Sequence, residues 1–195
     1  MRVVLLFLAL LLSGCVTKKE PIAELGINIE KKHSVGSSQG CRDKSLKVSQ
    51  AFGSMALGSV EMSYTDEEGR IFNYSQAKWQ DTPSNIVTME ILKNARQSEL
   101  FQSVLSSKSR SKSDFVLEVH IEDFMQYFQK ERSFILFSYV LALVDTKTNA
   151  VMATKTFSTK IDAKTLDAKG GAEAYRFAFE ELFAKNTIWL NEVCK

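Results

Sequence analysis

Alternating apolar and polar positions predict several strands in the first part of the chain. Apolar side chains in residues 23–30 fall on one face of an extended segment: Ala23, Leu25, Ile27 and Ile29. Residues 45–52 alternate in the same way. A polar turn at 65–69 that ends in glycine separates two further extended segments, 59–64 and 70–74. These last two segments therefore predict a hairpin.

Two segments with helical spacing follow. The run Asp81-Thr82-Pro83 places a capping side chain directly before a proline, which is typical of a helix start. The helical apolar pattern after it ends near Gln97. A longer helix is expected over 168–191, where apolar residues recur on one side: Tyr175, Ala178, Phe179, Leu182 and Trp189. Gly170-Gly171 near its start indicates either close packing or a frayed end.

Three strands are expected between the helices. Residues 115–122 alternate between apolar and polar, so one face of that strand is solvated. Residues 134–144 are apolar on both faces, which predicts a central strand buried between two layers. A turn at 145–149 leads into a strand over 151–161. The element order predicts an α/β (α+β) domain: one mixed, largely antiparallel sheet with two main helices, in a two- or three-layer sandwich.

Composition agrees with one domain and argues against one class of partner, nucleic acid. The chain has 195 residues, of which 45% are hydrophobic and 25% charged, enough for one compact core. Lys and Arg total 25 against 23 for Asp and Glu, a net charge of +2. Because nucleic-acid-binding domains are usually clearly basic, we expect no nucleic-acid partner.

The first residues have the pattern of a secretory signal. Residues 3–12 are uninterrupted apolar side chains behind Arg2, a run shorter than the roughly 20 residues that span a bilayer. The following Leu12-Ser13-Gly14-Cys15 resembles the lipobox of bacterial lipoproteins. The resemblance implies that residues 1–14 are removed and that Cys15 is acylated. The alternatives are an uncleaved anchor, or a chance cysteine behind an ordinary signal.

The mature chain then divides into a tether and a domain. Residues 15–21 form the lipidated tether, which binds the lipid membrane through acylated Cys15, and residues 22–195 form the globular domain. Val16, rather than Asp, follows the cysteine. By similarity to enterobacterial sorting rules, this favours the outer membrane, with the domain facing the periplasm.

Two cysteines remain for a disulfide. Cys41 and Cys194 lie near the two ends of the domain, and an exported protein is in an oxidising compartment. The sequence predicts one disulfide between them. Two free thiols, or one thiol buried in the core, are the alternatives.

One motif points to hydrolytic chemistry. Residues 36–40 match the G-x-S-x-G pattern of a nucleophile elbow, with Ser38 as the nucleophile. That motif requires a helix after the serine, whereas the chain here enters a strand-like segment. We therefore expect a Gly/Ser loop and no enzyme.

Metal and cofactor sites are also not expected. His33 and His120 are far apart in sequence, and no cysteine or histidine pair has metal-ligand spacing. The carboxylates Glu118, Glu122 and Asp123 beside His120 are typical of a solvated strand face. No phosphate-binding glycine loop is present, so the prediction is no metal and no cofactor.

Two surface features leave open alternatives. The loop 108–112 carries Lys108, Arg110 and Lys112 among serines, and it either contacts lipid headgroups or an acidic partner, or is simply solvated. A group of aromatics is either core or a partly exposed patch for a partner; its members are Phe124, Tyr127, Phe128 and Phe134.

A diffuse set of packing and turn residues across about 22–190 is similar to the ABC-type transport auxiliary lipoprotein family. These are Tyr64, Tyr74-x4-Trp79-x3-Pro83, Phe101-x2-Val104, the strand led by Asp114, the turn Asp145-x2-Thr148 and Trp189. The Gly/Ser loop at 34–40 departs from the family pattern.

The resemblance implies an accessory role in the cell envelope. Such lipoproteins work with ABC importers that contain an MCE-type subunit and move phospholipids or other hydrophobic molecules. The implied partners are the MCE-family periplasmic subunit and the ABC permease and ATPase. The alternative function is an unrelated lipoprotein, either surface-exposed as an adhesin or antigen, or active in lipopolysaccharide or β-barrel assembly.

Overall fold

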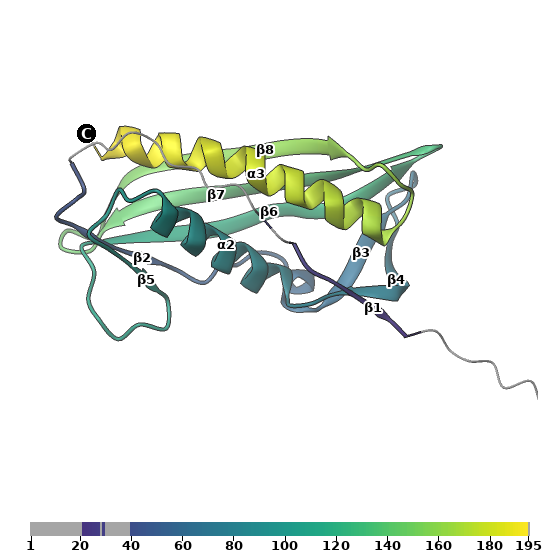
Figure 1. Cartoon of the computed structure of the whole chain (residues 1–195), viewed down its shortest axis with the longest axis horizontal. Helices are drawn as coiled ribbons and strands as arrows, with labels where there is room; N and C mark the ends of the chain where they lie inside the picture. Colours follow the sequence, from purple (N-terminus) through teal and green to yellow (C-terminus); the bar gives the residue numbers. More distant parts are fainter. Residues whose placement is uncertain (1–20, 28, 30–39, 195) are drawn as a thin grey trace, which may run out of the picture.

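A long three-stranded meander forms the middle of one mixed sheet (Figure 1). The structure is a computed structural model, and it describes residues 21–27, 29 and 40–194. Strands β6 (Phe115–Gln129), β7 (Arg132–Asp145) and β8 (Ala150–Asp162) pair antiparallel in chain order. The three strands expected between the helices are confirmed, and both connecting turns are tight.

The free edge of β6 is shared by two shorter strands. β2 (Ser45–Val48) pairs parallel with the first residues of β6, and β5 (Ser103–Ser106) extends the sheet beyond β2. β3 (Glu61–Thr65) pairs parallel with the last part of β6. β4 (Ile71–Trp79) and then β1 (Ala23–Leu25) extend the sheet beyond β3. The sheet therefore divides along β6 into two lobes, and we call the division the fork.

A short helical segment occupies the fork. After β2, the residues Phe52 and His120 form an isolated parallel bridge. The chain then makes the 3-10 helix η1 (Met55–Gly58) before it enters β3. Pairing with β6 resumes at Tyr64, opposite Gln126.

Two helices cover one face of the sheet. α2 (Pro83–Gln97) and α3 (Ala168–Val193) contact each other, and Nδ2 of Asn94 donates to Oγ1 of Thr187 at 3.1 Å. The expected start of the first helix is confirmed, because the N–H of Asn85 donates to Oγ1 of Thr82 at 3.3 Å. No helix in the described part of the chain is long and apolar enough to cross a membrane.

The sandwich has two layers, so the expectation that β7 is buried on both faces is wrong. Alternate β7 side chains point toward the helices and are 0% exposed: Ile135, Phe137, Tyr139, Leu141 and Leu143. Among the described residues, no helix lies over the opposite face of the sheet (Figure 1). Most β7 side chains on that face are only half-buried, because neighbouring strands alone shield them.

Several element boundaries differ from the pattern. The first strand ends at Leu25, and residues 28 and 30 of its expected range lie outside the described residues. The strand expected over 45–52 ends at Val48, although the N–H groups of Ser49 and Phe52 still donate to backbone oxygens of β6. The short strand β5 was not expected. Its pairing is parallel to β2, a non-local contact that alternation over four residues does not reveal.

A disulfide joins the two ends of the domain. Cys41 precedes β2 and Cys194 follows α3, and their Cα atoms lie 5.3 Å apart. The bond links positions separated by 153 residues. This is the pairing that the sequence predicts.

Candidate functional site

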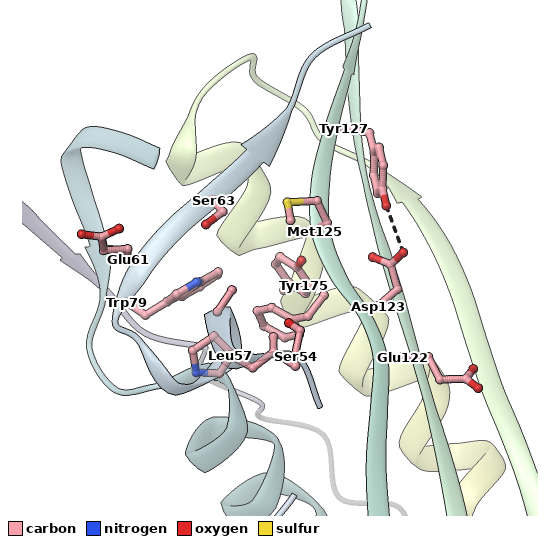
Figure 2. A pocket seen from close by; sticks show the side chains of 13 residues that line it. Ser54, Leu57, Glu61, Ser63, Trp79, Glu122, Asp123, Met125, Tyr127 and Tyr175 are labelled. Atoms are coloured by element: carbon pink, nitrogen blue, oxygen red, sulfur yellow. Dashed lines mark hydrogen bonds between the residues drawn. The ribbon is translucent and has the colours of Figure 1, made fainter. Parts of the chain in front are cut away.

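A small cavity opens at the fork (Figure 2). Its volume is about 150 Å³, and it lies between η1, β3 and the last part of β6. The end of β4 and the inner surface of α3 close it on the helix side. The cavity exists because no strand pairs with β6 between the two lobes.

Three aromatic rings form the inner wall of the cavity. Phe124 and Tyr175 are stacked with ring centroids 4.1 Å apart, and Trp79 meets both rings edge-on at 5.5–5.6 Å. Trp79 is the last residue of β4, immediately before the turn into α2. The three rings therefore fasten the β1–β4–β3 lobe to the helix layer and to β6.

A β-bulge in β6 sets which side chains face the cavity. The pairing of β6 with β7 shifts register between Ile121 and Asp123. Before the bulge the odd-numbered residues point to the helices, and after it the even-numbered residues do, beginning with Phe124. The sequence contains this signal, because the apolar alternation of β6 changes phase there.

The bulge also leaves a carboxylate with little solvation. Oδ2 of Asp123 accepts a hydrogen bond from Oη of Tyr127 at 2.9 Å, whereas Oδ1 is buried and has no hydrogen-bond partner among the described residues. Burial raises the pKa of Asp123, and the hydrogen bond from Tyr127 opposes this only in part. Burial and the neighbouring carboxylate raise the pKa of Tyr127 to about 12.

The size and lining of the cavity limit what it can bind. Sites for small molecules are commonly 300–1,000 Å³, so a cavity of about 150 Å³ is too small for a whole lipid. Its hydroxyl side chains include Ser54 and Ser63, and the lining contains no histidine or cysteine to activate them. Figure 2 shows the carboxylates of Glu61 and Glu122 directed away from the rings. The cavity therefore does not by itself indicate a function, and the outer surface of the domain is the better candidate site.

One candidate surface is the face of the sheet opposite the helices, which we call the bare face. Its middle row, on β7, is mostly apolar, and its half-buried members Leu136, Val140, Ala142 and Val144 are interrupted by the buried Ser138. The flanking row on β6 is polar and exposed: Glu118, His120 and Glu122. The flanking row on β8 is also polar: Thr154, Thr156, Ser158 and Lys160. An apolar stripe with a polar border is typical of a protein-binding surface.

Three of the candidate residues from the sequence lie outside the described residues. These are the lipidation site Cys15, together with His33 and Ser38 of the N-terminal loop. The lipidation of Cys15 and the expected absence of a Ser38 nucleophile stay predictions.

His120 and its neighbouring carboxylates lie on the bare face. The imidazole of His120 is stacked on the ring of Phe52 with centroids 4.6 Å apart. Phe52 is itself 58% exposed. Glu118 and Glu122 are exposed, as expected for a solvated strand face. The described residues contain no group of three or more His, Cys, Asp or Glu side chains placed to hold a metal ion.

The aromatic group near the β6–β7 turn divides between core and surface. Phe124 belongs to the core. Tyr127 and Phe134 are half-buried and stacked on the bare face, with centroids 5.3 Å apart. Phe128 points to the other face and meets the ring of Tyr64 at 5.2 Å. Neither of the two expected alternatives holds for the whole group.

The basic loop at 108–112 is held against the sheet. Nζ of Lys47, on β2, donates to the backbone oxygens of Ser109 and Ser111 at 3.2 and 2.7 Å. The loop therefore has a structural attachment that the sequence pattern did not predict. A role in binding lipid or an acidic partner stays a prediction.

Close packing, rather than fraying, explains the glycine pair at the start of α3. Gly171 lies against the side chain of Gln126, which is buried on β6. Nε2 of Gln126 donates to Oγ of Ser133 and to the backbone oxygen of Asp167, at 3.2 and 3.3 Å. Oε1 of Gln126 accepts from Oη of Tyr74 at 3.1 Å. Sequence reasoning missed Gln126, because a buried glutamine has no distinguishing pattern.

Comparison with solved structures finds this fold in uncharacterised bacterial proteins. Protein XCC0632 from Xanthomonas campestris, described by the family model DUF330, is 14% identical, with a TM-score of 0.75 over 88% of this chain and 95% of that one. The hypothetical protein CT253 from Chlamydia trachomatis is 11% identical, with a TM-score of 0.52 over 78% of this chain and 98% of that one. At these identities the similarity shows the fold alone. No protein-family model and no curated protein matches the sequence.

Proposed function

We propose that this protein is a lipid-anchored accessory subunit of an ABC transporter that contains an MCE-type subunit. Acylated Cys15 holds the domain at the periplasmic face of the outer membrane, and the domain docks the periplasmic MCE assembly. The transported cargo is a phospholipid or another hydrophobic molecule. The protein performs no chemical step and serves as a tether.

The bare face is the observation that carries a docking role. Val140 and Ala142 lie at its centre on β7, and they are half-buried although no helix or strand of the described residues covers them. Covering apolar side chains on an open sheet face lowers the free energy by about 25 cal/mol per Å² of apolar surface removed from water. A partner that covers this stripe would form a third layer, and residues 134–144 would then be buried on both faces, as their apolar pattern predicts.

The polar rows beside the stripe support a specific partner rather than a non-specific one. The β6 row has Glu118 and Glu122, whereas the β8 row has hydroxyl side chains and Lys160. A docked protein would meet one acidic side and one neutral or basic side. Such asymmetry fixes the orientation of the partner.

Affinity purification from membranes tests the proposal. The tagged full chain should recover the MCE-type subunit and the ABC permease and ATPase after mild solubilisation. Ala142→Glu puts a carboxylate in the centre of the bare face and should abolish this recovery. Ile188→Glu is the matched control, because Ile188 is 49% exposed on α3, in the helix layer.

Three outcomes would overturn the proposal. In the first, the wild-type chain recovers no transporter component. In the second, it recovers lipopolysaccharide or β-barrel assembly proteins in their place. In the third, Ala142→Glu and Ile188→Glu reduce recovery equally while both keep the Cys41–Cys194 disulfide. Protease treatment of intact cells adds an independent test, since a surface adhesin would be cleaved and a periplasmic domain protected.

A further inference from the structure

We propose that the end of the domain at which β1 begins rests on the phospholipid surface, with apolar side chains of three different segments in contact with lipid. This inference rests on the proposed anchor at Cys15. It adds a second, non-covalent membrane contact, and so fixes the orientation of the domain. We call this end the anchor end and the opposite one the disulfide end.

Strand directions define the anchor end. β1 runs parallel to β4, with Ala23 opposite Ala77, so the chain enters from the side of the β3–β4 turn. The β6–β7 turn and the loop from β8 to α3 lie at the same end, because Phe134 pairs with Asp162. Figure 1 shows these connections together at the right-hand end. The disulfide and the β7–β8 turn lie at the other end.

Exposed apolar side chains gather at the anchor end. Ile71 is 65% and Phe72 41% exposed at the start of β4. Leu166, in the loop before α3, is 52% exposed, and Ile22, just before β1, is 48% exposed. The four come from two connections, the β3–β4 turn and the β8–α3 loop, and from the chain entry. None of them fills the core.

An apolar groove lies beside these side chains. It has a volume of about 340 Å³ and opens between β1, β4 and the first turn of α3. Its lining is mostly apolar and includes Leu25, Tyr74, Ala77 and Ala168. The rings of Tyr64 and Phe72 are stacked nearby, 5.6 Å apart. Amphipathic tyrosine rings favour the boundary between water and lipid.

The length of the tether selects this end. Six residue steps separate Cys15 from Pro21, and a fully extended chain covers about 3.3–3.6 Å per residue, or about 20 Å in all. β8 has 13 residues and so extends for about 40 Å from the disulfide end to the anchor end. The acyl chains therefore keep the anchor end close to the bilayer, whereas the disulfide end reaches it only if the domain lies flat.

Charge at the turns indicates a contact with zwitterionic lipid. The β3–β4 and β6–β7 turns, with their first flanking residues, contain three bases: Arg70, Lys130 and Arg132. The same turns contain four acidic residues: Asp66, Glu67, Glu68 and Glu131. Arg70 pairs with Asp66, and the backbone N–H of Lys130 donates to the carboxylate of Glu67. With four acidic residues against three bases, these turns have no net attraction for anionic headgroups. The apolar side chains supply the contact.

Spin labels on the lipidated full chain test the orientation. The protein is reconstituted in vesicles of phosphatidylcholine and phosphatidylethanolamine. With Cys15 acylated and Cys41 bonded to Cys194, an introduced cysteine is the single free thiol. Nitroxides are placed by Phe72→Cys, Leu166→Cys and, at the disulfide end, Val151→Cys, where Val151 is 60% exposed.

The ratio of collisions with oxygen to collisions with a water-soluble nickel chelate reports lipid contact. We expect this ratio to be several-fold higher at positions 72 and 166 than at 151. Adding Ile71→Asn should lower the ratio at 166 toward the value at 151 while the protein still floats with the vesicles. Val151→Asn is the matched control and should leave the ratio at 166 unchanged.

The possible failures are distinguishable. A chain that does not float with vesicles overturns both the anchor and the orientation. A chain that floats with equal, water-like ratios at all three positions overturns the orientation and leaves the anchor intact. High ratios at all three positions mean that the domain lies flat, which also overturns the end-on contact.

Discussion

A Cβ atom on Gly171 would lie 2.1 Å from Oε1 of Gln126, so the first turn of α3 and the end of β6 are as close as a glycine permits. Gln126 cannot retreat easily, because its amide holds three hydrogen bonds to other elements. This contact joins the β1–β4–β3 lobe, the meander and α3 at one point.

Gly171→Ala should therefore destabilise the protein. Alanine is normally favoured over glycine inside a helix by about 1 kcal/mol, but here the methyl group would overpack the contact and cost about 1–3 kcal/mol. Urea unfolding measures the difference. Gly58→Ala is the control, since a Cβ there meets nothing within 4 Å, and it should change stability by no more than about 0.5 kcal/mol. A more stable Gly171→Ala variant would contradict the packing.

Loss of the Cys41–Cys194 disulfide should have a large effect on stability. The bond closes a loop of 153 residues, and the chain-entropy model assigns such a loop about 4–5 kcal/mol. Urea unfolding of the Cys41→Ala, Cys194→Ala double variant should show this loss. Reductant should lower the stability of the wild type toward the same value and leave the double variant unchanged. Thiols that react in the unfolded, unreduced wild type would contradict the bond.

Thr82 should contribute to stability through its cap on α2. Its hydroxyl accepts a hydrogen bond from the N–H of Asn85 in the first turn, and that N–H also donates to the backbone oxygen of Thr82 at 2.9 Å. Thr82→Ala should cost about 1 kcal/mol, whereas Thr82→Ser should keep most of the stability. Thermal unfolding of the two variants makes the comparison. Equal losses in both would show that the hydroxyl is not what matters.

Asp123 should make the fold less stable as the pH rises. Burial raises its pKa in the folded state above the value of about 3.9 in an unfolded chain. The stability linked to the protonated form is therefore complete below pH of about 4 and is lost as the pH rises through the folded pKa. Asp123→Asn stays neutral and keeps an acceptor for Tyr127.

Urea unfolding between about pH 2 and pH 7 covers the titration of Asp123 and of a control carboxylate. The stability of Asp123→Asn relative to the wild type should increase with pH. Asp114 is the control, because hydrogen bonds from Ser45 lower its pKa. Stability linked to Asp114 is present above about pH 4 and lost in acid, so the stability of Asp114→Asn relative to the wild type should fall with rising pH. The same trend for both variants would contradict the assignment.

The sequence predicted most of the elements because periodicity is a local property. The cap at Thr82, the hairpin before it and the three strands of the meander all follow from neighbouring residues. The fork does not follow from neighbouring residues, because the pairing of β2 and β3 with different parts of β6 depends on contacts between distant segments. The open face of β7 was also missed, since a strand with one open apolar face and a strand buried between two layers have the same apolar pattern.

The fork cavity illustrates the same limit. Trp79, Phe124 and Tyr175 are separated by 45 and 51 residues, and only the folded chain brings their rings together. The bulge that turns Phe124 toward the helices can be inferred from the change of apolar phase in β6. The burial of the Asp123 carboxylate cannot, because it depends on which segments pack beside β6.

The bond between Cys41 and Cys194 also orders events during biogenesis. Cys194 follows every strand and helix of the described structure, so its thiol emerges from the ribosome only after β6, β7, β8 and α3. Oxidation to the native pair thus depends on complete synthesis of the sheet. A truncated product would keep Cys41 as an unpaired thiol, open to mixed disulfides and recognisable to oxidoreductases as unfinished.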